Sequence, residues 1–468
     1  MGVSMKAQQR IKISKVDVTQ DKISGRGGIY FVLRYIENIF FYQRFEKLFN
    51  FLKGSAKGLS ILQFIKQVLA YFIDGSDMSM TSFDRRKQDA AYAALLENRP
   101  EEMASSHQIK RFFRKFILVG NWLFRKILLQ LFIWRLHIEQ PDIIELFVDT
   151  MVLDNNDAQQ REGVDPTYKK KRGFQPFQIS WKCYLVDAIF RTGSVHGNHG
   201  TEFKKAMTRL TLAIRKEYCD VPIIVTSDSA FMDDDNFCYF EQQLKINYIC
   251  AGKQYADLKQ YVQQLSPQQF NSFSSPHQSW RYTEFGNRLK SWSQFRRCIF
   301  TTLENDDNGQ LKLEFTQTDS FTYTNIGQDP YLTQQLMQAG GQEYLSTEKI
   351  IQMNHQRGTG EINHRSVKEF ATKEQLPFER LGMNRAYYYL MIISYFLHVA
   401  YKYDVASEVI PLTSYPTTFR RQLIDFAAKI ISTGGEYILK VTQVIYDHLN
   451  IRKIWELTGE PSPIPACR

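Results

Sequence analysis

The order of strand-like and helix-like segments between residues 141 and 251 limits the possible fold more than any other feature of the chain. Five segments combine branched aliphatic and aromatic residues with strand-like patterning: 143–152, 177–186, 189–195, 221–226 and 246–251. Two intervening segments show helical spacing, 201–218 and 234–244. A turn is expected at Asp187. The predicted order is therefore strand, strand, strand, helix, strand, helix, strand.

This is the order of a ribonuclease H-like core, in which an antiparallel hairpin precedes crossovers to parallel strands. We predict an α/β fold whose core is built in two parts, from residues 141–251 and 346–400. Residues 252–345 separate these parts and are rich in Gln, Ser and Asp, with several strand-like stretches and a hairpin turn at Asn308-Gly309. They are predicted to form a β-rich insertion domain.

The flanking regions are predicted to be helical. The chain of 468 residues is too long for one ordinary hydrophobic core, so further domains are expected beside the α/β core. Residues 1–140 show apolar recurrence at three and four positions, which indicates a helical domain, and we assign DNA binding to it. Residues 401–468 are expected to be a helical region with a dimerisation role, ending in a proline-rich extended tail.

The charge of the chain favours a polyanionic partner. The net charge is +10 and the pI is near 9.1, and each basic residue placed on a phosphate releases condensed counterions. Four basic residues would share one helix face after a start signal at Ser105-Ser106: Lys110, Arg111, Arg114 and Lys115. That helix is either the second helix of a helix-turn-helix in a major groove or a core helix with a solvated basic face.

A second basic run offers the same two interpretations. Lys169, Lys170, Lys171 and Arg172 follow the first core strand. They either grip a DNA backbone near the active site or form a solvated loop.

Cysteine spacing and hydropathy indicate the cellular compartment. The six cysteines show no Cys-x-x-Cys spacing and no adjacent histidine cluster, which argues against a zinc site or a disulfide framework and fits a reducing cytoplasm. The most apolar long run, residues 117–134, is broken by Arg125 and Lys126 and is predicted to be a buried helix. No membrane association is expected.

Two aspartates mark the ends of two predicted core strands. Asp149 closes the run Leu146-Phe147-Val148, and Asp228 follows residues 223–227. These strands are neighbours in the predicted sheet, and two close carboxylates repel each other unless a divalent cation lies between them. Mg²⁺ suits oxygen-only ligands, and Mn²⁺ is expected to substitute for it. Asp154 is the competing candidate for the first ligand.

Glu361 is the candidate for a third ligand. It lies near the start of a predicted helix, with Arg357 four residues before it and Lys368 seven after it. A helix aligns these positions on one side, where both cations could hold phosphates around the metal. The three carboxylates would form a two-metal site for in-line displacement at phosphorus. Glu369 competes with Glu361, because eight residues are close to two helical turns.

The carboxylate regions resemble those of bacterial insertion-sequence DDE transposases, in the group with a Tyr, Arg, Glu, Lys signature. Arg357, Glu361 and Lys368 match the last three signature positions, and Asn354 stands where the group has Tyr. Three further stretches are similar to this family: Phe147-Val148-Asp149-Thr150, Gly173-Phe174-Gln175-Pro176 and Ser227-Asp228-Ser229-Ala230-Phe231. The resemblance covers roughly residues 141–400.

The resemblance implies cut-and-paste transposition, often through a hairpinned DNA end. The partners would be the terminal inverted repeats and target DNA, bound by a homodimer at the nucleoid of a bacterial cytoplasm. It also suggests that Trp292 of the insertion stacks on a flipped base. Trp280 is a second candidate for this role, and Trp292 could instead belong to the hydrophobic core.

Other interpretations remain open from the sequence. A nuclease of the same fold would cut DNA and never join it, and a DNA-binding protein derived from a transposase would no longer use the metal site. His196 and His199 lie beyond a predicted strand end near Asp149, where they are either ligands or bases, or ordinary loop residues.

Overall fold

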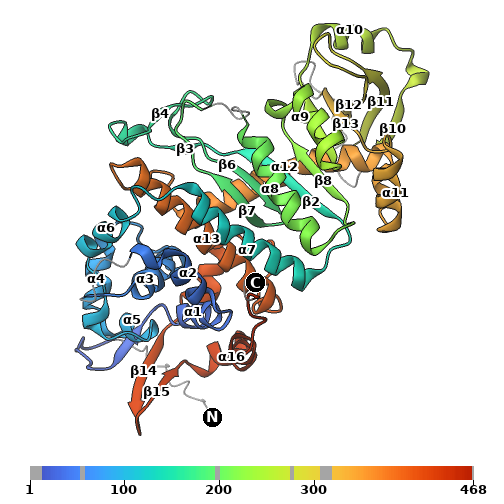
Figure 1. Ribbon diagram of the computed structural model, residues 1–468. Helices are drawn as coiled ribbons and strands as arrows, with labels where there is room; N and C mark the ends of the chain where they lie inside the picture. The colour runs from blue at the N-terminus through green and yellow to red at the C-terminus, as the bar shows by residue number, and fades with distance from the viewer. Residues whose placement is uncertain (1–12, 53–57, 196–200, 275–278, 306–318, 466–468) are drawn as a thin grey trace, which may run out of the picture.

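A computed structural model describes residues 13–52, 58–195, 201–274, 279–305 and 319–465, with the backbone alone at Asn305 and residues 356–363. Its centre is a nine-stranded mixed sheet with the order β10-β11-β12-β13-β9-β8-β2-β6-β7 (Figure 1). Strands β2 (Ile144–Thr150), β8 (Ile223–Ser227) and β9 (Asn247–Gly252) run parallel to one another, whereas all other neighbours pair antiparallel. The predicted mixed α/β architecture is confirmed.

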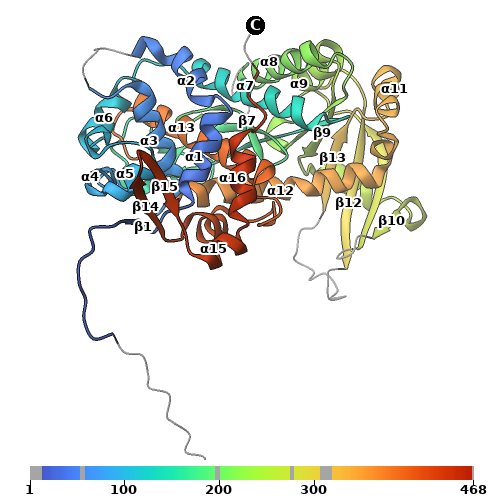
Figure 2. The ribbon, with the colours of Figure 1, turned by 90° about the horizontal axis from the view of Figure 1, so that it is seen from below.

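Helices cover both faces of this sheet. Helix α12 (Thr347–Ala371) contacts β2, β8 and β9 and crosses the sheet, as Figure 2 shows. Helix α7 (Asn121–Glu139) contacts β7 (Tyr184–Ile189) and α8 (Glu202–Glu217). The long helix α13 (Leu381–Asp404) is buried over most of its length and packs against α3 (Ile61–Asp74), α6 (Ser106–Arg114), α7 and β7. None of the helices in the described ranges is long and apolar enough to cross a membrane.

The hairpin of β6 (Phe177–Trp181) and β7 turns earlier than the sequence suggests. The expected turn at Asp187 is wrong, because Asp187 lies inside β7 and is completely buried. Both of its carboxylate oxygens accept hydrogen bonds from Arg125 of α7, at 2.8 and 2.6 Å, and this ion pair offsets the cost of burying the charge. The chain instead turns around Lys182, whose φ is +52°.

The segment predicted as an insertion domain extends the core sheet. Its strands are β10 (Asn271–Ser274), β11 (Ser279–Asn287), β12 (Arg296–Asn305) and β13 (Ser320–Thr324). Strand β13 pairs antiparallel with β9, so Phe321 lies opposite Gly252 and the ladder continues outward. The segment also contains α10 (Ala256–Gln263) and α11 (Pro330–Gln338). Residue 252 is therefore not a break in the sheet, and the expected turn at Asn308-Gly309 lies outside the described residues.

The N-terminal region is helical, as expected, and begins with a short strand, β1 (Lys22–Ser24). Its helices are α1 (Ile29–Asn38), α2 (Phe41–Phe49), α3 (Ile61–Asp74), α4 (Ser82–Gln88), α5 (Ala90–Leu95) and α6 (Ser106–Arg114). They pack against the C-terminal helices: the Arg34 side chain of α1 donates a 2.8 Å hydrogen bond to Thr458 of α16 (Ile451–Gly459). The two ends of the chain therefore build one part of the fold together.

The C-terminal region, expected to be helical, also contains two strands. Helices α14 (Pro416–Phe419), α15 (Gln443–His448) and α16 flank a hairpin of β14 (Ala428–Thr433) and β15 (Glu436–Lys440). Gly434 and Gly435 form its turn with φ of +59° and +85°, a conformation that favours glycine at both positions. Strand β14 also pairs with β1, which adds a small sheet at the edge of the helical part (Figure 2).

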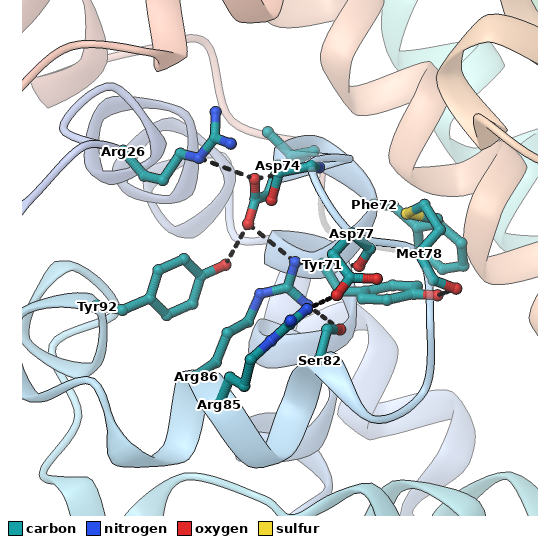
Figure 3. A network of polar contacts seen from close by, with 12 residues as sticks. Arg26, Tyr71, Phe72, Asp74, Asp77, Met78, Ser82, Arg85, Arg86 and Tyr92 are labelled. Atoms are coloured by element: carbon teal, nitrogen blue, oxygen red, sulfur yellow. Dashed lines mark hydrogen bonds and ion pairs between the residues drawn. The ribbon is translucent and has the colours of Figure 1, made fainter.

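A buried polar network closes the end of α3. The Asp74 side chain is 2% exposed and accepts hydrogen bonds from Arg86 at 2.9 Å and from Tyr92 at 3.4 Å, with Arg26 at 3.3 Å on its other oxygen (Figure 3). Close by, the buried Arg420 side chain donates to the carbonyl oxygens of Phe72 and Phe370, both at 2.7 Å. Arg420 thereby joins the ends of α3 and α12.

Candidate active site

The structure places Asp149 and Asp228 side by side at the carboxyl ends of two parallel strands. Val148 of β2 lies opposite Ser227 of β8, so the residue after each is an aspartate. Neighbouring strands are about 4.8 Å apart. Alternation along β2 directs Glu145 and Asp149 to the same face, and Glu145 accepts a hydrogen bond from Tyr344, which precedes α12.

Asp228 points toward the same side of the sheet. It lies four positions after Ile224, whose side chain packs in a cluster with Ile350 and Ile351 of α12. Even spacing along a strand keeps residues on one face, so both aspartates lie on the face that α12 covers.

Backbone contacts orient the two carboxylates. One Asp149 oxygen accepts the Thr150 N–H at 2.6 Å. Asp228 caps the short 3-10 turn Ser229–Phe231 by accepting the Ala230 N–H at 2.9 Å. The Asp149 side chain is 30% exposed and Asp228 is half-buried, so both are accessible from solvent at the sheet edge.

Two residues that the sequence analysis did not identify join this site. His364 of α12 has its Nδ1 atom 3.6 Å from an Asp149 carboxylate oxygen. Tyr168 is 59% exposed, and partial burial of its hydroxyl raises the pKa to about 12, with the charges of Asp149 and Asp228 adding to the shift. The negative potential of both aspartates therefore converges near one hydroxyl group. His364 could have been predicted from the sequence, because it lies three residues after Glu361 on the same helix face. No sequence pattern pointed to Tyr168.

A cavity of about 800 Å³ opens between the end of β2 and α12. Its lining includes Thr150 and Met151 after Asp149, and His364, Lys368 and Glu369 of α12. Lys169 also reaches it, from the loop that carries Tyr168. The cavity therefore brings basic groups and the neighbourhood of Asp149 to a single solvent-accessible space.

The third candidate carboxylate lies on the helix that borders this cavity. The backbone of Glu361 belongs to α12, as does that of Arg357, but both side chains lie outside the described part. Among the described side chains, no group of three His, Cys, Asp or Glu residues is arranged to hold a metal ion. Lys368 forms an ion pair with Glu374 at 2.9 Å.

The competing carboxylates have other contacts. Glu369 pairs with Arg365 at 3.0 Å and accepts a hydrogen bond from Thr417 at 3.3 Å. Asp154 pairs with Lys171 at 2.7 Å, and this contact is the main cause that lowers the pKa of Asp154. Asn354, at the position of the signature Tyr, is buried and donates to Thr322 of β13 at 2.8 Å.

Six of the predicted DNA-binding residues lie on two exposed elements away from α12. Lys110, Arg111 and Arg114 are exposed on α6, which follows α5 and a short 3-10 turn, Pro100–Glu102. Lys170, Lys171 and Arg172 are exposed at the tip of a small three-stranded sheet, β3-β5-β4 (Leu153–Asp154, Arg172–Phe174 and Asp165–Pro166), beside Tyr168.

The tryptophans of the insertion have different surroundings. Trp292 is 6% exposed and packs edge-on against Phe237 and Tyr323, so stacking on a base would require the ring to leave this position. Trp280 is partly exposed and lies 4.2 Å from the His355 ring, centre to centre. His196 and His199 lie outside the described residues.

Comparison with known proteins places this site in a family context. The sequence profile of the family described as Transposase DDE domain group 1 matches residues 6–457. Among solved structures, the chain is similar to one in a cryo-EM structure of the piggyBac transposase synaptic complex with hairpin DNA, with 12% identity and a TM-score of 0.38. That match covers 86% of this chain and 82% of the other. No curated protein sequence matches the chain.

Proposed function

The chain belongs to the transposase DDE domain group 1 family, and from this premise we propose that it cleaves transposon ends and transfers the freed strands to target DNA. The observation that carries the proposal is the pair Asp149 and Asp228, adjacent on parallel strands and facing α12. The strand order β7-β6-β2-β8-β9 supports a ribonuclease H-like assignment for this part of the sheet.

Asp149, Asp228 and Glu361 are proposed to hold two Mg²⁺ ions, with Mn²⁺ as a substitute. The donor set fits a hard cation: the aspartates offer carboxylate oxygens at one edge, and their charges act together on Tyr168. When bound, such ions neutralise the phosphoryl group and make a water or hydroxyl group more nucleophilic. In-line displacement by water, and then by a 3′-hydroxyl, needs no covalent enzyme intermediate.

Helix spacing supports Glu361 as the third ligand. His364 and Lys368 both line the cavity, and positions 361, 364 and 368 follow one another by three and four on a single helix face. Because the Nδ1 atom of His364 lies 3.6 Å from Asp149, this helix face is directed toward the aspartates.

Other residues of this chain are proposed to bind and orient DNA. Lys368 and Arg357 would hold phosphates beside the carboxylates, and the hydroxyl of Tyr168 can donate a hydrogen bond to a phosphate oxygen. Two exposed basic groups would hold the flanking duplex: Lys110, Arg111 and Arg114 on α6, and Lys170, Lys171 and Arg172 near the site. The nucleic-acid partners are the terminal inverted repeats of a bacterial insertion sequence and its target, bound by a homodimer at the nucleoid.

The test is cleavage of labelled DNA that carries the ends of the element, with Mg²⁺ or Mn²⁺. Asp149→Ala, Asp228→Ala and Glu361→Ala should each abolish nicking and joining while DNA binding persists. Asp154→Ala and Glu369→Ala are the matched controls, because these carboxylates have contacts with Lys171 and Arg365. Cleavage that survives Glu361→Ala and is lost in Glu369→Ala would move the third ligand.

Strand transfer needs its own readout. Products joined to a target plasmid distinguish a transposase from a nuclease of the same fold, because both would use the same carboxylates for the first cut. Cleavage without any joined product would favour the nuclease. DNA binding without cleavage under either metal ion would favour a DNA-binding protein that has lost the chemistry.

A further inference from the structure

Strand β15 (Glu436–Lys440) is the outer strand of the three-stranded sheet β1-β14-β15. No strand within the described ranges pairs with its other edge. Its side chains are also open to solvent, since Tyr437 is 74% exposed and Ile438 is 36% exposed. An exposed strand edge presents unpaired N–H and C=O groups that can pair with another strand.

The turn decides which groups β15 presents. Thr433 and Glu436 flank the two-residue turn, so the Thr433 carbonyl accepts the Glu436 N–H and they form a hydrogen-bonded pair. Hydrogen-bonded and non-hydrogen-bonded pairs alternate along an antiparallel ladder. Ile438 and Lys440 therefore also bond to β14, and Tyr437 and Leu439 direct their backbone groups away from the hairpin.

The sequence of β15 complements itself in one register. If two copies pair antiparallel about a twofold axis at Ile438, Tyr437 of each copy meets Leu439 of the other, which joins the outward backbone groups. The same register places Glu436 opposite Lys440 of the other copy, twice. Shifting the register by two residues removes these charge pairs.

The charges at the ends of β15 lack such partners within one chain. Neither Glu436 nor Lys440 has an ion-pair partner in the part of the chain that the structure describes. Lys440 lies opposite Lys429 across the β14–β15 ladder, and Lys429 already pairs with Asp21 of the same chain at 2.8 Å. Lys440 is therefore the cation of this facing pair that can take a carboxylate from another chain.

We propose that a second copy of this chain pairs with β15 in this register, which makes β1-β14-β15 a continuous six-stranded sheet across a twofold axis. The inference rests on the homodimer of the proposed function and names its contact surface. A groove of about 520 Å³ beside the strand contributes apolar surface to the same contact, since Tyr446 and Trp455 line it and are 41% and 48% exposed.

Disulfide trapping tests the register directly. In this register Ile438 faces itself across a non-hydrogen-bonded pair, where Cα atoms are about 4.5 Å apart and a disulfide fits. Ile438→Cys should cross-link into a covalent dimer on mild oxidation, in a full-length background with Cys219→Ser and Cys467→Ser. Tyr437→Cys is the matched control, because residue 437 faces Leu439 of the other copy; it should cross-link at least about tenfold more slowly.

A charge exchange tests the same contact without new cysteines. Glu436→Lys and Lys440→Glu should each raise the Kd of the dimer at least about tenfold by sedimentation, whereas the double variant restores complementarity and dimerisation. Both side chains are exposed, so unchanged thermal stability of the monomer confirms folding. A double variant no tighter than the single ones would overturn the proposal. A dimer that Ile438→Cys fails to trap would overturn this surface alone, while a monomer under all conditions would also remove the proposed homodimer.

Discussion

Asp74 at the end of α3 and the pair Asp149 and Asp228 at the ends of β2 and β8 show two ways in which this fold uses carboxylates. Asp74 is 2% exposed and lies among Arg26, Arg86 and Tyr92 (Figure 3). Asp149 is 30% exposed and approaches His364, and Asp228 caps the backbone that follows it. The first region encloses its charge with cationic groups, and the second leaves two carboxylates partly exposed at the edge of the sheet.

This difference separates stability from chemistry. A buried charge costs several kcal/mol unless it is paired, so removing one member of such a pair leaves the other uncompensated. A partly exposed carboxylate keeps much of its hydration and contributes less to folding. Variants at Asp74 should therefore act on stability, and variants at Asp149 and Asp228 on catalysis.

Asp228→Ala should give the largest effect, a loss of about 10⁴-fold in the rate of DNA cleavage, or about 5 kcal/mol of transition-state stabilisation. The physical reason is loss of a proposed metal ligand beside Asp149. Single-turnover cleavage with Mg²⁺ measures the rate, and thermal unfolding without metal should show a midpoint within a few degrees of wild type. A large fall in the midpoint would break the comparison, because Asp228 would then be a stabilising residue like Asp74.

Asp74→Asn should cost about 3 to 5 kcal/mol in the free energy of unfolding of the helical part, because Arg86 would remain buried without its carboxylate. Urea denaturation followed by circular dichroism measures the change. Asp77→Asn is the matched control: Asp77 is 32% exposed and pairs with Arg85, which is 71% exposed, so its loss should cost less than about 1 kcal/mol. Equal costs for the two variants would contradict the argument.

The sequence predicted the parts of the fold that depend on local periodicity. Alternation and strand order placed Asp149 and Asp228 at neighbouring strand ends, and the structure brings them together. Asp187 misled the prediction because aspartate favours turns, whereas its place in β7 depends on Arg125, which lies 62 residues earlier. Local patterns carry no information about such a partner.

The remaining differences also arise from distant contacts. The sequence of residues 252–345 does not indicate that β13 pairs with β9, because pairing with a strand far away in the sequence produces no local pattern. Tyr168 and His364 reach Asp149 and its neighbourhood from a loop and a helix far apart in sequence. The β14–β15 hairpin is an exception: it was not predicted, although Gly434-Gly435 between two strand-like runs is a local turn signal.

Tyr168 offers an intermediate test of the comparison through its pKa. Replacing both Asp149 and Asp228 with Asn should lower the pKa of Tyr168 from about 12 by the smaller part of its shift, because two nearby charges disappear while burial, the larger cause, remains. The difference in ultraviolet absorbance between Tyr168-containing and Tyr168→Phe proteins, titrated from pH 8 upward, reports this group alone. Since the folded state favours the protonated hydroxyl, any stability from it is complete below pH 10 and is lost toward pH 12. An unchanged pKa would place the aspartates too far away to form one site with Tyr168.

The smallest effect is expected for Lys170, Lys171 and Arg172, the basic tip of the small sheet β3-β5-β4. These residues show the same contrast between paired and exposed charge. Lys170→Ala and Arg172→Ala should each reduce the slope of log Kd against log salt concentration by about 0.9, the loss of one phosphate contact. Lys171→Ala should change the slope less, because Asp154 lies 2.7 Å from its ammonium group and already compensates the charge. Fluorescence anisotropy on duplex DNA between about 50 and 200 mM salt measures the slopes. A larger change in slope for Lys171→Ala than for its two neighbours would mean that DNA displaces Asp154 from this lysine. The contact between Lys171 and phosphate would then form only when DNA binds.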